Sequence, residues 1–138
     1  MGLPGPGTDI LNALKFSGFV EANEFSTTAY LADVGTRFAP GDLQIGDPVQ
    51  YISAGGRTFR SLAARLNNNT SIPPSTTVTV TLVVNGVDTL SVDLTETARS
   101  AIALGAAVAP AGSTYDVRVD VDETTPDGLA LTAEANFN

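Results

Sequence analysis

The segment from Thr76 to Thr95, TTVTVTLVVNGVDTLSVDLT, constrains the fold more than any other part of the chain. Two runs of alternating apolar and polar residues are joined by Asn85-Gly86, and this dipeptide suits the mirror-image turn of a β-hairpin because both residues adopt positive φ at little cost. The segment therefore predicts two antiparallel strands with threonines, serines and aspartates on a solvated face. The residues predicted to face the core are Val78, Val80, Leu82 and Val84 in the first run, and Leu90, Val92 and Leu94 in the second.

Composition limits the size and chemistry of the domain. The chain has 138 residues, which is enough for one domain with a two-layer core. Its 15 acidic residues outnumber the 7 basic ones, and the formal charge of -8 opposes binding to nucleic acid and to anionic membranes. Because the chain has neither cysteine nor histidine, disulfides and thiolate or imidazole metal ligands are excluded.

Alternating patterns predict strands along most of the remaining chain. About eight short strands, separated by glycine, proline and asparagine, predict an antiparallel β-sandwich over residues 13–138, and a jelly roll suits this length best. In the cleanest pattern, Tyr115–Asp122, the apolar residues are expected in the core and the charged ones in solvent. Gly18 is expected to weaken its strand or to mark a bulge. The other predicted strands begin at Ala13 or cover Thr27–Leu31, Val49–Ile52, Thr58–Leu66, Ala101–Val108 and Leu129–Phe137.

Residues 1–12 are predicted to form an extended N-terminal arm. The segment Gly2-Leu3-Pro4-Gly5-Pro6-Gly7 is too rich in proline and glycine to hold a strand ladder or to start a helix well. A collagen-like stalk is disfavoured, because the next glycine of the triplet pattern is replaced by Thr8.

The residues that remain offer little catalytic chemistry. A nucleophilic serine needs a neighbouring base, and without histidine or cysteine only Lys15 or a carboxylate could serve. Asp120 and Asp122 point the same way on a strand and form a geometrically possible carboxylate pair, but alternate acidic residues on an exposed sheet face are more typical of solubility and edge protection. We therefore predict that the chain is not an enzyme and that it uses no cofactor.

Two kinds of ligand stay open as alternatives. The region Asp116–Asp127 is rich in carboxylates that suit calcium, although their spacing is not that of an EF-hand and a solvated acidic rim is equally compatible. No metal site is therefore assigned. Jelly rolls also host sugar-binding sites, which usually include exposed aromatic residues. Tyr30, Tyr51 and Tyr115 are the only tyrosines, and the alternation places Tyr115 in the core. The acidic residues that form the possible calcium cluster are Asp116, Asp120, Asp122, Glu123 and Asp127.

Several segments resemble a group of small virion proteins of tailed phages. The segments are Ser26–Leu31, Arg57–Leu62, Val84–Thr89 and Pro110–Val119, and the resemblance extends over about Phe16 to Asn136. The resemblance implies a jelly-roll domain of the kind found in head decoration, head-fibre and tail or baseplate proteins, which usually assemble as trimers. Where relatives often have Gly-Asp, this chain has Gly112-Ser113.

The resulting expectation is a non-enzymatic phage virion structural protein. The short chain favours a capsid decoration protein that binds the major capsid protein, or another virion protein, on the outer surface of the capsid as a homotrimer. In this arrangement the arm Gly2–Gly7 attaches the trimer, and the small residues Ala101, Ala103, Ala106 and Ala107 face a neighbouring copy. The alternative is a tail or baseplate module that binds a host receptor or a host-surface glycan.

Overall fold

The computed structural model describes residues 12–20, 28–33, 44–45, 50–67, 72–122 and 129–138. They form eleven strands, and none of them lies in a helix that could cross a membrane. The strands are β1 (Asn12–Val20), β2 (Thr28–Tyr30), β3 (Ala32–Asp33), β4 (Gln44–Ile45), β5 (Tyr51–Ile52), β6 (Arg57–Leu66), β7 (Val78–Val84), β8 (Val87–Leu94), β9 (Ser100–Ala109), β10 (Thr114–Val121) and β11 (Leu129–Phe137).

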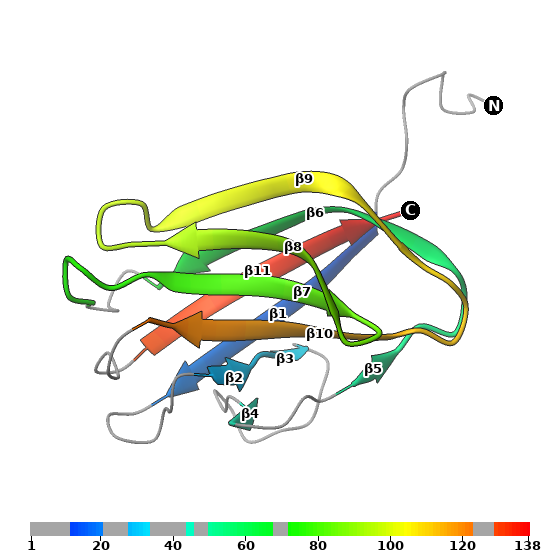
Figure 1. Ribbon diagram of the computed structural model, residues 1–138, viewed down its shortest axis with the longest axis horizontal. Coiled ribbons are helices and arrows are strands. Elements are labelled where there is room, and N and C mark those ends of the chain that lie inside the picture. The colour runs from blue at the N-terminus through cyan, green and yellow to red at the C-terminus, as the bar shows by residue number, and fades with distance from the viewer. Residues whose placement is uncertain (1–11, 21–27, 34–43, 46–49, 68–71, 123–128) are drawn as a thin grey trace.

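The strands form two antiparallel sheets that pack face to face (Figure 1). Sheet A is five-stranded with the order β3-β1-β11-β6-β9. Sheet B is six-stranded with the order β4-β2-β10-β7-β8, and β5 pairs with β10 outside this path. Apart from the short strands β3, β4 and β5, each sheet has four strands, and among these the β7–β8 hairpin is the one connection that stays within a sheet. This order is that of an eight-stranded jelly roll, so the predicted fold is confirmed.

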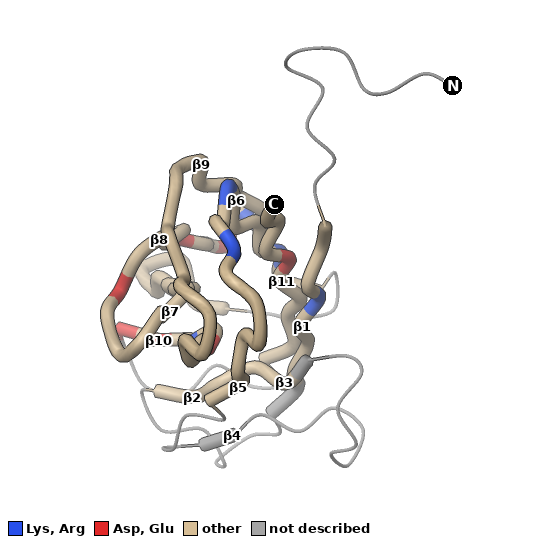
Figure 2. The backbone as a smooth tube through the Cα atoms, turned by 90° about the vertical axis from the view of Figure 1, so that its right-hand side faces the viewer, with Lys and Arg blue, Asp and Glu red and all other residues tan. Residues whose placement is uncertain are grey.

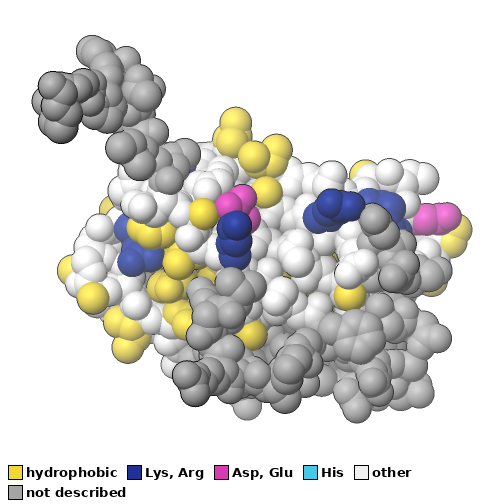
Figure 3. All heavy atoms as spheres, turned by 180° about the vertical axis from the view of Figure 1, so that it is seen from behind, with side chains coloured by type: hydrophobic (Ala, Val, Ile, Leu, Met, Phe, Trp, Pro, Cys, Tyr) yellow, Lys and Arg dark blue, Asp and Glu magenta, His cyan; other side chains and the backbone are white. Residues whose placement is uncertain are grey.

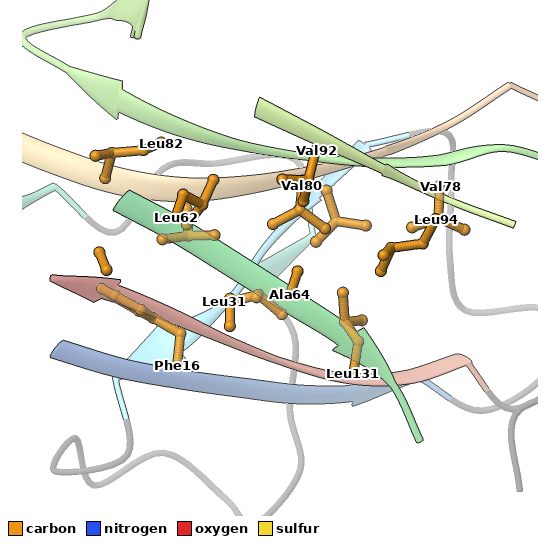
Figure 4. Close-up of a cluster of buried hydrophobic side chains, with 14 of the residues drawn as sticks. Phe16, Leu31, Leu62, Ala64, Val78, Val80, Leu82, Val92, Leu94 and Leu131 are labelled. Atoms are coloured by element: carbon orange, nitrogen blue, oxygen red, sulfur yellow. The ribbon is translucent and has the colours of Figure 1, made fainter. Parts of the chain in front are cut away.

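The core lies between the sheets and is built from the alternating apolar positions. Side chains from both sheets point toward one another in Figure 4, with Phe16, Leu62 and Leu131 on sheet A and Val80 and Val92 on sheet B. The burial pattern matches the predicted inward residues in β6, β7, β10 and β11. Because strand side chains alternate between faces, this shared pattern fixes the register of each pair.

The predicted hairpin is present as β7 and β8. Its two turn residues have positive φ, 51° at Asn85 and 78° at Gly86, as the mirror-image turn requires. The ladder is regular from Val78↔Leu94 to Leu82↔Leu90 and then shifts, so that Val83 lies opposite Asp88. Thr89 is therefore an extra residue in β8, a β-bulge that the alternation did not predict.

The N-terminal part of the domain departs from the prediction in two places. The ladder between β1 and β11 runs without a shift from Asn12↔Phe137 to Val20↔Leu129, so Gly18 marks no bulge in this pair. The segment predicted as one strand, Thr27–Leu31, ends in sheet B at Tyr30, and the next strand pairs with β1 in sheet A. The fully buried Leu31 lies at this crossing, where its N–H donates to the carbonyl oxygen of Val117 (2.9 Å).

Strand β9 is present where a strand was predicted, but the residues it presents to solvent differ from those expected. Of the four alanines predicted to face a neighbouring copy, only Ala106 is exposed: Ala107 is buried, and Ala101 and Ala103 pack against the core. The reason is the close approach of β8, since a Cβ on Gly105 would lie 2.7 Å from Cδ2 of Leu90. The inward row of β9 must therefore be small, and its larger residues face outward.

Candidate functional site

Arg118 is the centre of a polar cluster on the outer face of sheet B. Its guanidinium forms a bidentate pair with Asp88, through Nη1–Oδ1 (2.9 Å) and Nη2–Oδ2 (2.8 Å), and its Nε donates to Oδ2 of Asp120 (2.7 Å). The other oxygen of Asp120 accepts from the hydroxyl of Thr28 (2.8 Å). We call these four residues the Arg118 cluster. The cluster joins strands β2, β10 and β8 across the intervening strand β7.

The bulge at Thr89 places Asp88 in this cluster. Strict alternation from Leu90 would turn Asp88 toward the core, where an unpaired carboxylate is costly. The extra residue instead brings Asp88 opposite Val83, on the outer face. The hydroxyl of Thr89 donates to the carbonyl oxygen of Leu82 (2.8 Å), which gives this acceptor a partner beside the shift.

The pairing shifts the titration of both partners. The hydrogen bonds from Arg118 hold the pKa of Asp88 below its usual value, because they favour the charged carboxylate. In the same way, the hydrogen bond to Asp88 raises the pKa of Arg118, with a smaller contribution from Asp120. Both groups are therefore charged throughout the physiological range, and neither is poised to transfer a proton.

Two residues predicted to face solvent on sheet B are buried. Thr81 lies between Arg118 and Ser91 in the cross-strand register and is only 3% exposed, since the bridge from Arg118 to Asp88 passes over β7. Asp116 is 5% exposed and accepts from the backbone N–H of Gln50 (2.8 Å). Thr81 and Asp116 are buried by contacts with other segments of the chain, and alternation within one strand cannot predict such contacts.

The carboxylates considered for calcium or for catalysis have other partners. Asp120 belongs to the Arg118 cluster, and Asp122 accepts from the backbone N–H of Thr77 (2.8 Å). Glu123 and Asp127 lie outside the described residues. Among the described residues, no group of three acidic side chains is placed to hold a metal ion.

The outer face of sheet B also has a shallow polar hollow of about 460 Å³. Its lining offers hydroxyl and carboxylate groups together with the guanidinium of Arg118, and Tyr30 is the cross-strand neighbour of Arg118 on β2. These groups can form hydrogen bonds with a polyhydroxylated ligand. The lining residues are Thr79, Thr81, Asp88, Thr89, Leu90, Ser91, Arg118 and Asp120.

Strand β9 carries an exposed apolar row at the edge of sheet A. Ile102, Leu104 and Val108 are 62%, 78% and 68% exposed, and we call these three residues the apolar row. This surface was not predicted from the sequence, although larger residues alternate there with alanine and glycine. The small residues of this strand were predicted to face a neighbouring copy, whereas its most exposed side chains are the larger ones.

Beside the apolar row, the outer face of sheet A is hollowed over about 690 Å³. Lys15, Arg65 and Glu134 lie around an otherwise small-residue floor that includes Ala63, and Ile102 of the apolar row also lines the hollow. Figure 3 looks onto this side of the molecule and shows basic side chains spread along the face below apolar side chains at its upper edge. The hollow is wide and open, with little of the polar convergence of a catalytic site.

The predicted attachment segment Gly2–Gly7 lies outside the described residues, and the same is true of the rest of the arm up to residue 11. Asn12, which was assigned to the arm, begins β1 and pairs with Phe137.

The sequence matches no protein-family model, and no curated protein shows significant similarity to it.

Proposed function

We propose that this chain is a non-enzymatic structural protein of a phage virion, a decoration protein that binds the outer surface of the capsid as a trimer. The proposal is supported by the jelly-roll strand order together with the resemblance of segments such as Arg57–Leu62 and Pro110–Val119 to small virion proteins. Fold alone does not determine function. The observation that carries the assembly role is therefore the apolar row on β9.

The apolar row favours assembly because it breaks the usual protection of sheet edges. Exposed edge strands are normally short or charged, since open backbone groups and apolar side chains promote association. The sequence of β9, SAIALGAAVA, has ten residues and no charge. We expect another protein chain to cover a strand of this kind in the assembled particle.

The location on the particle can be tested directly. Antibodies raised against the purified chain should label intact virions of the encoding phage over the whole head shell, and the chain should be present in many copies per particle. Removing the protein should make the shell less resistant to heat or osmotic shock. Labelling confined to the tail, or particles that lack the chain, would contradict the proposal.

The attachment arm calls for a separate experiment. A chain that lacks residues 2–9 should keep its sandwich and its association state but lose binding to shells that the full chain decorates. Binding would be measured by co-sedimentation with undecorated shells, with the full chain as control. Equal occupancy by the two proteins would exclude the arm as the attachment segment.

A second candidate function is binding of a host-surface glycan by a tail or baseplate module. The observation in its favour is the polar hollow beside the Arg118 cluster, whose hydroxyl and carboxylate groups suit sugar hydroxyls. A glycan array with the wild-type protein, repeated with Ser91→Trp to block the hollow, would test it. Binding that is lost in the variant supports this function, whereas no binding to any glycan argues against it.

A further inference from the structure

The four edges of the two sheets differ in how they are protected. The outer strands β3 and β4 have only two residues each. Strand β8 is longer, but Asp88, Asp93 and the bulge at Thr89 interrupt it. These are common devices against edge pairing. Strand β9, the remaining edge, shifts its register against β6 between Leu104 and Ala107, but it has ten residues, no charge and the apolar row.

Strands β8 and β9 lie next to each other, so the apolar row runs along one side of the sandwich rather than across a face. Figure 1 shows the two strands together at the upper side of the molecule. The outer faces of sheets A and B lie on either side of this edge. A surface that joins copies of the chain here brings their outer faces close to one another.

Among the described residues, the two outer faces carry opposite net charge. On β1, β6, β9 and β11, the exposed charged side chains that the structure describes are Lys15, Arg60 and Arg65, with the half-buried Glu134 as the acidic one. On sheet B, Asp88 and Asp93 are exposed, Asp120 is half-buried and Arg118 is the basic residue. Figure 2 views the layers edge-on, with most acidic positions on the layer of β7, β8 and β10 and most basic positions on the layer of β1 and β6.

From these observations we infer that the partner of the apolar row is a further copy of this chain. With the trimer of the proposed function, on which this inference rests, the contact closes as a ring of three. Each copy places its apolar row near the three-fold axis and sets its basic outer face of sheet A against the acidic outer face of sheet B of the next copy. The contact is heterologous, and opposite charges fix which faces meet. A two-fold dimer would instead bring faces of like charge together. The inference deepens the proposed function by naming the surfaces that form the trimer.

The absence of cysteine in the sequence makes a clean cross-linking test possible. Thr132 is exposed on the outer face of sheet A, and Ser91 is exposed on that of sheet B. Three proteins would be compared: Thr132→Cys, Ser91→Cys and the double variant. The folding of each protein would be checked by circular dichroism and its molecular mass measured by light scattering. Each would then be treated with a short bis-maleimide cross-linker.

The ring predicts that all three proteins have the mass of three chains and that only the double variant is cross-linked to dimers and trimers. Efficient cross-linking of either single variant would show that like faces meet and would overturn the ring. A monomeric or dimeric wild-type protein at micromolar concentration would also overturn it. Because this test uses the isolated chain, its result is distinct from the labelling of virions that tests the proposed function.

Discussion

The outer faces of sheets A and B differ in how their side chains are arranged. On sheet B, Arg118 links Asp88 and Asp120, and the strands are joined within one chain. On sheet A, the apolar row and the basic rim of the hollow face outward. The charged residues of sheet B therefore stabilise the monomer, whereas we propose that the outer face of sheet A and its edge contact a neighbouring copy.

The largest effect is expected from placing a charge in the apolar row, which tests whether this row drives association. Ile102→Asp should reduce the mass of the assembly from three chains to one, because a carboxylate buried at the ring axis lacks a partner. Mass would be measured by sedimentation and folding by circular dichroism. Val87→Asp is the matched control, since Val87 and Ile102 are both 62% exposed and Val87 lies at the hairpin end. An Ile102→Asp protein that keeps its mass would separate the apolar row from assembly.

The next largest effect is expected on sheet B. Arg118→Ala removes the partner of two carboxylates and uncovers Thr81, and it should lower the free energy of unfolding by about 2 kcal/mol. Lys15→Ala, on the outer face of sheet A, should change it by less than about 0.5 kcal/mol in the monomeric Ile102→Asp background. Urea titration of both proteins in that background measures the two values. Equal losses would remove the distinction between the faces.

A smaller effect should follow from filling the space between β8 and β9. Gly105→Ala places a Cβ 2.7 Å from Cδ2 of Leu90, and rotation of this flexible side chain limits the cost to about 1 kcal/mol. Combining it with Leu90→Ala should cost less than the sum of the two single changes, because the clash is then absent. Strict additivity in thermal unfolding would show that the two residues do not touch.

The smallest effect concerns pH. Because Arg118 lowers the pKa of Asp88 in the folded protein, the pair stabilises the fold above the unfolded pKa, close to 3.8, and this contribution is lost as pH falls through the folded pKa. Asp88→Asn should be less stable than the parent protein by roughly 0.5 kcal/mol at neutral pH, since Asp88 is well exposed. The difference should disappear in acid. A difference that persists at low pH would assign the effect to shape rather than charge.

Local sequence patterns predicted the parts of the fold that depend only on residues within one strand or turn. The Asn85-Gly86 turn and the alternation around Val80 and Val117 identify strands, faces and core without knowledge of the neighbours. The jelly-roll order then follows from strand number, spacing and length. The β-bulge at Thr89 could not be read in this way, because alternation around Leu90 is equally compatible with a regular strand.

The candidate surfaces depended on contacts between distant strands. Arg118 and Asp88 are separated by β7 in the sheet, and no spacing in the sequence connects them. The outward direction of Ile102 depends on Leu90, which limits the inward row of β9 to small residues. Sequence therefore predicted β9 as a strand, but the choice of its exposed face required the packing of β8.

The pairing of Asn12 with Phe137 brings the two ends of the sandwich to one corner. A short linker between these positions would permit a circular permutant opened at Asn85-Gly86, with every strand partner retained. For the same reason, a fluorescent protein fused after residue 138 would emerge beside the segment that precedes Asn12. If that segment anchors the chain, such a fusion would crowd the anchor, whereas a reporter inserted at the hairpin tip would leave the corner clear.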